Sequence, residues 1–103
     1  MQQLRVTNAG SQPLLALRVL FPDTMISYGD VAAGTTSGYV DVPGGVYEYS
    51  AFIFAYNGSE VTQRVEDFVG EIPMKGRRFT YVLEFAVIGS EPGILIKSVT
   101  KDR

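Results

Sequence analysis

The chain has 103 residues, a formal net charge of −2, 46% hydrophobic residues and no cysteine or histidine. This length and apolar fraction predict one folded domain over residues 1–103. The missing residue types exclude disulfide bonds, Ser-His-Asp or Cys-His catalysis and the usual zinc and haem sites. Calcium needs only oxygen ligands, but the acidic segment Glu66–Glu71 lacks the Asp-x-Asp-x-Asp-Gly spacing, so we expect no metal and no cofactor. The net negative charge argues against nucleic acid as a partner.

In chain order, turn residues separate short segments rich in Val, Ile, Tyr, Phe and Thr, which are typical of strands. The predicted strand segments are Gln2–Thr7, Leu14–Phe21, Ile26–Tyr28, Thr35–Val42, Val46–Tyr56, Ser59–Glu66, Arg78–Val87 and Ile94–Thr100. Asn57-Gly58 favours a type I′ hairpin turn, since both residues tolerate positive φ. The pattern predicts an all-β, antiparallel two-sheet sandwich of seven or eight strands.

The longest apolar run, Leu14–Phe21, is interrupted by Arg18. It is far shorter than the roughly 20 residues of a membrane-spanning helix, so we expect no transmembrane segment in this chain. Its position inside the chain and its internal charge also argue against a signal peptide.

Alternation of apolar and polar residues assigns the core faces of three segments. Leu4 and Val6 flank Arg5 and are expected to point inward. The expected core positions of the second and seventh segments are Leu15, Leu17, Val19, Phe21, Phe79, Tyr81, Leu83, Phe85 and Val87.

The segment Val46–Tyr56 is less regular. One face carries Tyr47, Tyr49, Ala51, Ile53 and Ala55, and the other face carries the charge of Glu48. The uncharged face is therefore the expected core, which places Phe52, Phe54 and Tyr56 outward beside Leu14 and Leu20. Two interpretations follow: a β-bulge near Ser50 returns the phenylalanines to the core, or the five residues form an apolar interface with a protein partner or a second copy.

Charged residues offer little chemistry. Glu48, Glu84 and the acidic segment Glu66–Glu71 are expected to be solvated surface charges, with Phe68 buried beneath that segment. Lys75, Arg77 and Arg78 are likewise read as a solvated basic face. A carboxylate-dependent hydrolase would need two acids about 5–10 Å apart across a cleft, so it is the least favoured alternative and we expect no enzyme.

Tyrosines offer a second binding hypothesis. Tyr39, Tyr47 and Tyr49, together with Tyr56, form a carbohydrate-binding platform if their rings are exposed and coplanar. The other interpretation is cross-strand packing, since tyrosine suits half-buried strand positions.

A series of turn and aromatic motifs resembles a known family. The series comprises Ser27–Tyr39 (SYGDVAAGTTSGY), Tyr47-x-Tyr49-x-Ala51, Asp67–Glu71 and Gly76-x-x-Phe79-Thr80-Tyr81. It resembles the small β-sandwich domains of exported Gram-negative lipoproteins, which are loosely similar to transthyretin-like and immunoglobulin-like domains. The resemblance implies a secreted, non-enzymatic structural or binding module at the periplasmic or cell-surface side. It also implies a longer precursor in which a removed signal peptide and a lipid-anchoring cysteine precede Leu4 of this chain.

Overall fold

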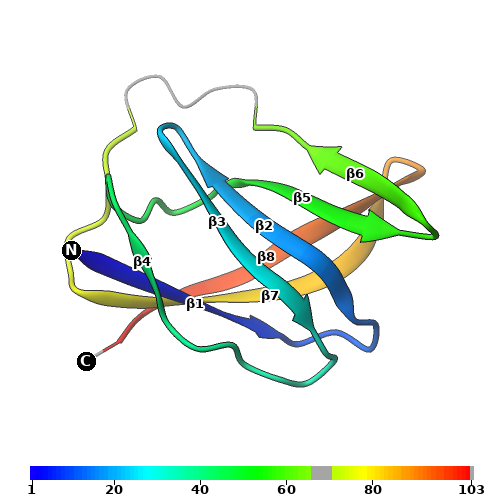
Figure 1. Ribbon diagram of the computed structural model, residues 1–103, viewed down its shortest axis with the longest axis horizontal. Coiled ribbons are helices and arrows are strands. Elements are labelled where there is room, and N and C mark those ends of the chain that lie inside the picture. Colours follow the sequence, from blue (N-terminus) through cyan, green and yellow to red (C-terminus); the bar gives the residue numbers. More distant parts are fainter. Residues whose placement is uncertain (66–70, 103) are drawn as a thin grey trace.

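Eight β-strands make up the regular structure in the computed structural model, which describes residues 1–65 and 71–102. The strands are β1 (Gln2–Asn8), β2 (Leu14–Phe21), β3 (Thr24–Val31), β4 (Val40–Val42), β5 (Ala51–Tyr56), β6 (Ser59–Gln63), β7 (Arg78–Ile88) and β8 (Glu91–Asp102). They form sheet A in the order β4-β1-β7-β8 and sheet B in the order β3-β2-β5-β6 (Figure 1). Across the described ranges there is no helix that could cross a membrane. The predicted all-β sandwich is confirmed.

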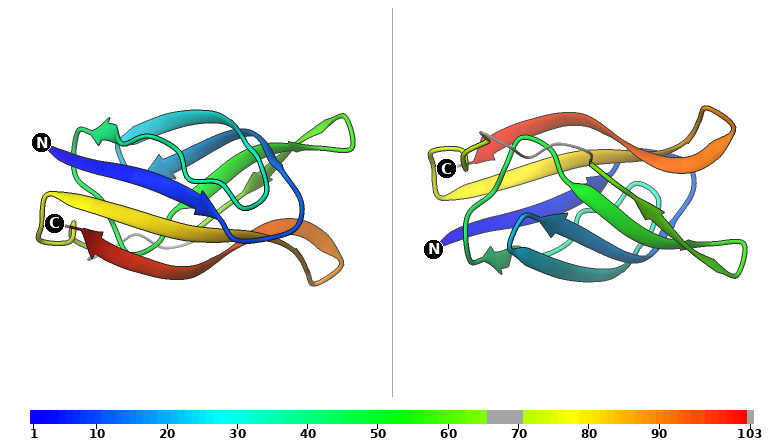
Figure 2. Two further views of the ribbon diagram at one scale, coloured as in Figure 1. Left: turned by 90° about the horizontal axis from the view of Figure 1, so that it is seen from below. Right: turned by 90° about the horizontal axis from the view of Figure 1, so that it is seen from above.

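The two sheets lie face to face as separate layers (Figure 2). Within sheet A, β1 and β7 run parallel, whereas β1 pairs with β4 and β7 with β8 in the antiparallel direction. A parallel pair needs a long connection, and here the chain builds all of sheet B between β1 and β7. The start of β1 and the end of β8 consequently lie at the same end of the sandwich (Figure 1).

The core lies between the inner faces of the sheets. The alternation assigned to β1 and to β7 as far as Leu83 is confirmed, because Leu4, Val6, Phe79, Tyr81 and Leu83 are all buried. Each such side chain contributes about 1.5–3 kcal/mol on leaving water. Their polar or charged neighbours along β1 and β7 therefore point to the outer face of sheet A. The core position expected at Val87 was wrong: this residue is 65% exposed, because the end of β7 leads into the turn to β8.

A β-bulge near the start of β2 corrects the expected face of two leucines. The pairing of β2 with β3 and β5 shifts register between residues 14 and 18, and Ala16 has a φ of 48°. Because the bulge adds a residue, Leu14 and Leu17 both face the core, at 1% and 0% exposure, while Leu15 is 39% exposed. The expectations of an outward Leu14 and an inward Leu15 were wrong for this reason.

The expected face of β5 is also reversed. Phe52 and Phe54 are each 1% exposed and belong to the core, while Ala51, Ile53 and Ala55 face outward and are half-buried. The charge of Glu48 was used to assign the outward face of this segment, but Glu48 lies at a bend in residues 45–50, ahead of β5. Strand alternation does not hold there, so the assignment was wrong. The phenylalanines reach the core by regular alternation within β5, with no register shift in its pairing with β6.

Two-residue turns join three of the strand pairs. The β5–β6 turn has φ values of 50° at Asn57 and 77° at Gly58, so the predicted hairpin with positive φ at both positions is confirmed. Phe21 pairs with Thr24, and Ile88 with Glu91, across the other two turns.

Two buried tyrosine hydroxyls tie irregular or distant segments to the sandwich. Tyr28 of β3 donates to the carbonyl oxygen of Leu4 in β1 at 2.7 Å, which links the two sheets. Tyr81 of β7 donates to the carbonyl oxygen of Tyr47 and so anchors residues 45–50. Burial raises the pKa of both hydroxyls well above the usual value of 10.0, so both stay protonated donors.

Candidate functional site

The five residues expected at an apolar interface do not share an exposed face. Leu14, Phe52 and Phe54 lie in the core. Tyr56 is half-buried and stacks on Phe85, with ring centroids 4.8 Å apart. Leu20 does face outward, on sheet B, where it pairs with Met25 and Ala51. An exposed aromatic patch on β5 is therefore excluded.

The tyrosines proposed as a sugar platform lie in different surroundings. The Tyr47 ring packs 5.6 Å from that of Phe21 at the edge of the core. Tyr49 is half-buried in the irregular residues 45–50. The Tyr39 hydroxyl donates a hydrogen bond to the Asp102 carboxylate of sheet A at 2.8 Å. Tyr39 and Tyr47 therefore contact different parts of the molecule, and Tyr39 is the member that lies in a polar cluster.

Two of the acidic residues singled out from the sequence, Glu48 and Glu84, lie at the surface of the described part of the chain. Glu84 lies 3.5 Å from Lys97, Glu48 is exposed, and the described residues contain no group of three or more acids that could hold a metal ion. Phe68 and most of the acidic segment around it lie outside the described residues. The burial expected for the Phe68 side chain therefore stays a prediction.

The outer face of sheet A carries a cluster of polar and charged side chains that contact one another. Cross-strand pairing aligns Asp41, Gln3, Arg78 and Asp102 in one row over all four strands. In the next row, Arg5 of β1 pairs with Thr80 of β7, and Thr80 pairs with Thr100 of β8. We call Arg5, Tyr39, Arg78, Thr80 and Asp102 the arginine–tyrosine cluster.

Asp102 is the common acceptor of this cluster. Its Oδ2 atom accepts hydrogen bonds from Thr80 Oγ1 at 2.5 Å and from Tyr39 OH at 2.8 Å, and lies 3.8 Å from Arg5 Nε. Arg5 Nε in turn donates to Thr80 Oγ1 at 2.9 Å. Thr80 is only 6% exposed although it faces outward, so these side chains cover it.

Two guanidinium groups pack against one aromatic ring. The Cζ atoms of Arg5 and Arg78 lie 4.8 Å and 5.2 Å from the centroid of the Tyr39 ring. Cation–π attraction operates at such distances. The contacts place Tyr39, which precedes β4, over β1 and β7.

The hydrogen bonds and charges set the protonation states of the cluster. Burial raises the pKa of Asp102, whereas hydrogen bonds from Thr80 and Tyr39 and the charges of Arg5 and Arg78 lower it. Together the lowering effects are larger, so the pKa lies below its usual value. The hydrogen bond to Asp102 is the main cause that raises the pKa of Tyr39. At neutral pH the carboxylate is ionised and the phenol is protonated.

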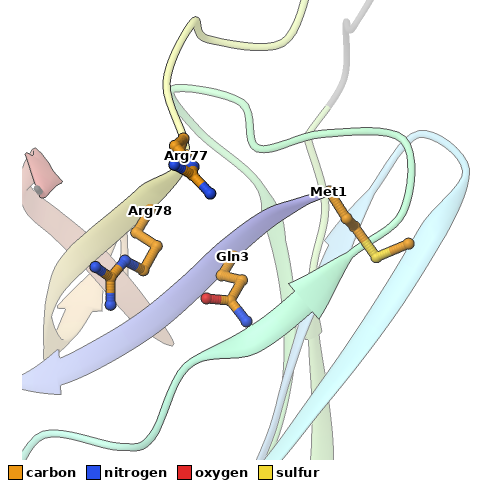
Figure 3. A pocket seen from close by; sticks show the side chains of 4 residues that line it. All are labelled: Met1, Gln3, Arg77 and Arg78. Atoms are coloured by element: carbon orange, nitrogen blue, oxygen red, sulfur yellow. The ribbon is translucent and has the colours of Figure 1, made fainter.

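A pocket of about 400 Å³ lies beside the cluster, at the start of β1 and β7. Met1, Gln3, Arg77 and Arg78 line it (Figure 3). The Gln3 side chain donates to Asp41 Oδ1 at 2.9 Å, and Arg77 is exposed. The pocket therefore presents two guanidinium groups and an amide next to the polar face.

The chemistry of this face is recognition by hydrogen bonds and charge. Arginine and tyrosine are among the residue types that most often carry binding energy at interfaces. The Thr80 hydroxyl is buried, accepts a hydrogen bond from Arg5 and donates one to Asp102, so it does not reach a ligand.

Sequence reasoning missed most of this cluster. It named Tyr39 as part of a sugar platform and treated Arg77 and Arg78 as solvated charges, but it assigned no role to Arg5 or Asp102. Alternation with Leu4 and Val6 marks Arg5 as outward-facing. The missing information was the parallel pairing of β1 with β7, which brings Arg5 to Thr80.

Comparisons with protein-family models, with curated proteins and with solved structures found no match for this chain.

Proposed function

We propose that this chain is a non-enzymatic binding module of an exported bacterial protein, periplasmic or at the cell surface, and that the outer face of sheet A is its binding surface. The observation that supports this assignment is the packing of two arginines on Tyr39 beside the hydrogen bond that the buried Thr80 donates to Asp102. A purely solvated sheet face needs no such ordered network.

The state of the titratable groups supports binding rather than catalysis. General acids and bases work best with a pKa near the operating pH. The pKa of Asp102 is shifted down and that of Tyr39 is shifted up, which moves both away from neutrality. The export of the module rests on the motif series that begins with Ser27–Tyr39 and on its resemblance to lipoprotein domains.

Carbohydrate is the ligand class that we favour, because the face combines one aromatic ring with many hydrogen-bonding side chains. Tyr39 lies among Arg5, Arg78 and Thr80, and Thr7 and Thr36 hydrogen-bond to each other on the same sheet at 2.8 Å. This arrangement narrows the sugar-platform hypothesis to a single tyrosine with polar neighbours.

A pair of blocking variants tests the location of the surface. Thr100 and Thr62 are both exposed threonines on edge strands, but Thr100 pairs with Thr80 on sheet A and Thr62 pairs with Ile53 on sheet B. We expect Thr100→Trp to weaken binding to an array of bacterial surface saccharides at least about tenfold. Thr62→Trp is the matched control and should bind like the wild-type chain.

The reverse pattern, with Thr62→Trp blocked and Thr100→Trp unaffected, would assign binding to sheet B and contradict the proposal. A wild-type chain that binds no saccharide on the array would contradict the carbohydrate assignment.

A further inference from the structure

We propose that the pocket beside the arginine–tyrosine cluster binds an acidic group of the ligand, a carboxylate or a phosphate. This inference rests on the proposed function, because it names the ligand chemistry of the same face. The pocket residues are Met1, Gln3, Arg77 and Arg78 (Figure 3).

Backbone and side-chain hydrogen bonds hold the pocket walls in place. Gln3 and Arg78 are direct partners in the parallel pair of β1 and β7, and the Gln3 N–H donates to the Arg77 carbonyl oxygen at 2.9 Å. Nε2 of Gln2 donates to the carbonyl oxygens of Met74 and Gly76, at 2.5 and 2.9 Å, which fixes the approach to Arg77. Binding therefore orders few groups, and ordering is a main cost of association.

Gly76 shapes the same approach. Its φ is 148°, and a Cβ atom there would lie 2.8 Å from Cζ of Phe79 and 2.9 Å from Cε of Lys101. Gly76 therefore packs closely against the side chains of Phe79 and Lys101, and this packing fixes the backbone next to the exposed Arg77.

The local charge balance favours an anion. Among the described residues, Arg5, Arg77 and Arg78 lie on this face with two carboxylates, and both carboxylates have partners: Asp41 accepts from Gln3, and Asp102 accepts from Thr80 and Tyr39. The guanidinium group of Arg77 has no hydrogen bond or ion pair within the described ranges 1–65 and 71–102. The face thus carries excess positive charge on a chain whose net charge is −2.

Guanidinium groups match this task by shape as well as charge. Their parallel N–H groups bind the two oxygens of a carboxylate or phosphate in a fork. A pocket of about 400 Å³ is within the size range of small-molecule sites and holds one sugar residue with its acidic group. The carboxylate of an acidic saccharide and the phosphate of a phosphorylated or free anion share this chemistry.

Nuclear magnetic resonance titration of the whole chain tests the inference. The probes are D-glucuronate, inorganic phosphate and the neutral D-glucose. We expect glucuronate or phosphate to shift the amide signals of Gln3, Arg77 and Arg78, with the affinity lowered about tenfold in Arg77→Gln through loss of one charged hydrogen-bonding group. Arg64→Gln is the matched control, since Arg64 is also exposed but follows β6 on the other sheet.

The two acidic probes distinguish a saccharide carboxylate from a phosphate as the acidic group that the pocket binds. Shifts with glucuronate alone identify a saccharide carboxylate, and shifts with phosphate identify a phosphate group; either result supports the inference. Glucose binding as tightly as glucuronate, or an equal loss in Arg64→Gln, would overturn it. No signal change with either acid up to about 10 mM would also overturn it, and the Thr100→Trp and Thr62→Trp comparison would still decide the proposed binding face.

Discussion

The side chain of Gln63 pairs with the backbone of Ile94 as a neighbouring strand would. Gln63 Nε2 donates to the Ile94 carbonyl oxygen at 2.9 Å, and the Ile94 N–H donates to Gln63 Oε1 at 2.6 Å. Gln63 ends β6, the edge of sheet B, and Ile94 lies in β8, the edge of sheet A. One amide therefore closes a side of the sandwich and occupies backbone groups of an edge strand, which otherwise invite pairing with other chains.

Replacing Gln63 should open this side of the sandwich. Gln63→Leu leaves the Ile94 N–H and carbonyl groups without their partners, so we expect a loss of about 1–3 kcal/mol in the free energy of unfolding. Self-association should also increase at high concentration. Chemical denaturation and sedimentation measure the two effects, and Thr62→Ala on the same strand is the control. A Gln63→Leu chain as stable and as monomeric as that control would show that the pairing is dispensable.

Gly93 gives an independent route to the same contact. A Cβ atom at this position would lie 2.9 Å from Gln63 Oε1 and 2.9 Å from Cδ1 of Ile88. Gly93→Ala should therefore disturb the Gln63 pairing from the opposite side and destabilise the chain in the same direction as Gln63→Leu.

The buried side chain of Asn8 hydrogen-bonds to backbone groups of two other segments of the chain. It is 0% exposed, and its Nδ2 atom donates to the carbonyl oxygens of Gln12 and Val31 at 2.7 and 3.0 Å, while Oδ1 accepts from the Gly10 N–H at 3.0 Å. Asn8→Ala should cost about 2–4 kcal/mol, because it leaves buried carbonyl groups unpaired. Gln12→Ala, which keeps the accepting carbonyl, should change stability little. Equal midpoints for the two variants in urea would contradict this role.

The sequence was sufficient to predict features set by local chemistry. The Asn57-Gly58 turn and the inward face of β7, including Phe79 and Tyr81, both follow from residue type and period alone. The assignment of Leu14 was wrong because a single extra residue at Ala16 changes the face of everything before it. Nothing in the residue types of Leu14 and Leu15 distinguishes the two leucines.

The candidate site could not be predicted for a different reason. Its residues come from β1, β7, β8 and the segment before β4, and Asp102 lies beyond the strand predicted over Ile94–Thr100. Only the pairing of strands that are distant in sequence shows that Arg5, Thr80 and Asp102 meet. Local patterns define faces of strands, whereas the order of strands in a sheet decides which faces become neighbours.

A substitution at Ala16 tests the β-bulge that reversed the expected faces of Leu14 and Leu15. Its φ of 48° lies in the left-handed region, which costs a residue with a Cβ roughly 1–2 kcal/mol, while its N–H donates to Asp30 Oδ1 at 2.9 Å. Ala16→Gly should therefore stabilise the chain by up to about 1 kcal/mol despite the greater flexibility of glycine. Ala55→Gly, in regular strand β5, should instead destabilise it by at least about 0.5 kcal/mol. Destabilisation of similar size at both positions would argue against strain at Ala16.

The protonation of Asp102 should govern part of the stability of sheet A at low pH. Its pKa in the folded chain lies below the usual 3.8, through hydrogen bonds from Thr80 and Tyr39 and the charges of Arg5 and Arg78, which outweigh burial. The ionised carboxylate therefore stabilises the folded chain above the usual pKa, and this contribution is lost as the pH falls through the lowered value.

The measurement is the thermal midpoint of the wild-type chain and of Asp102→Asn as a function of pH. The wild-type chain should have the higher midpoint at neutral pH, because the neutral amide lacks the charge that Arg5 and Arg78 attract. The difference should hold down to about pH 5 and shrink as the pH falls through 3.8 and below. Thr80→Val, which removes one donor to Asp102 and keeps the carboxylate, should shift the loss toward higher pH. Parallel curves for wild type and Asp102→Asn down to the acid limit would mean that the network does not hold the carboxylate in its ionised form.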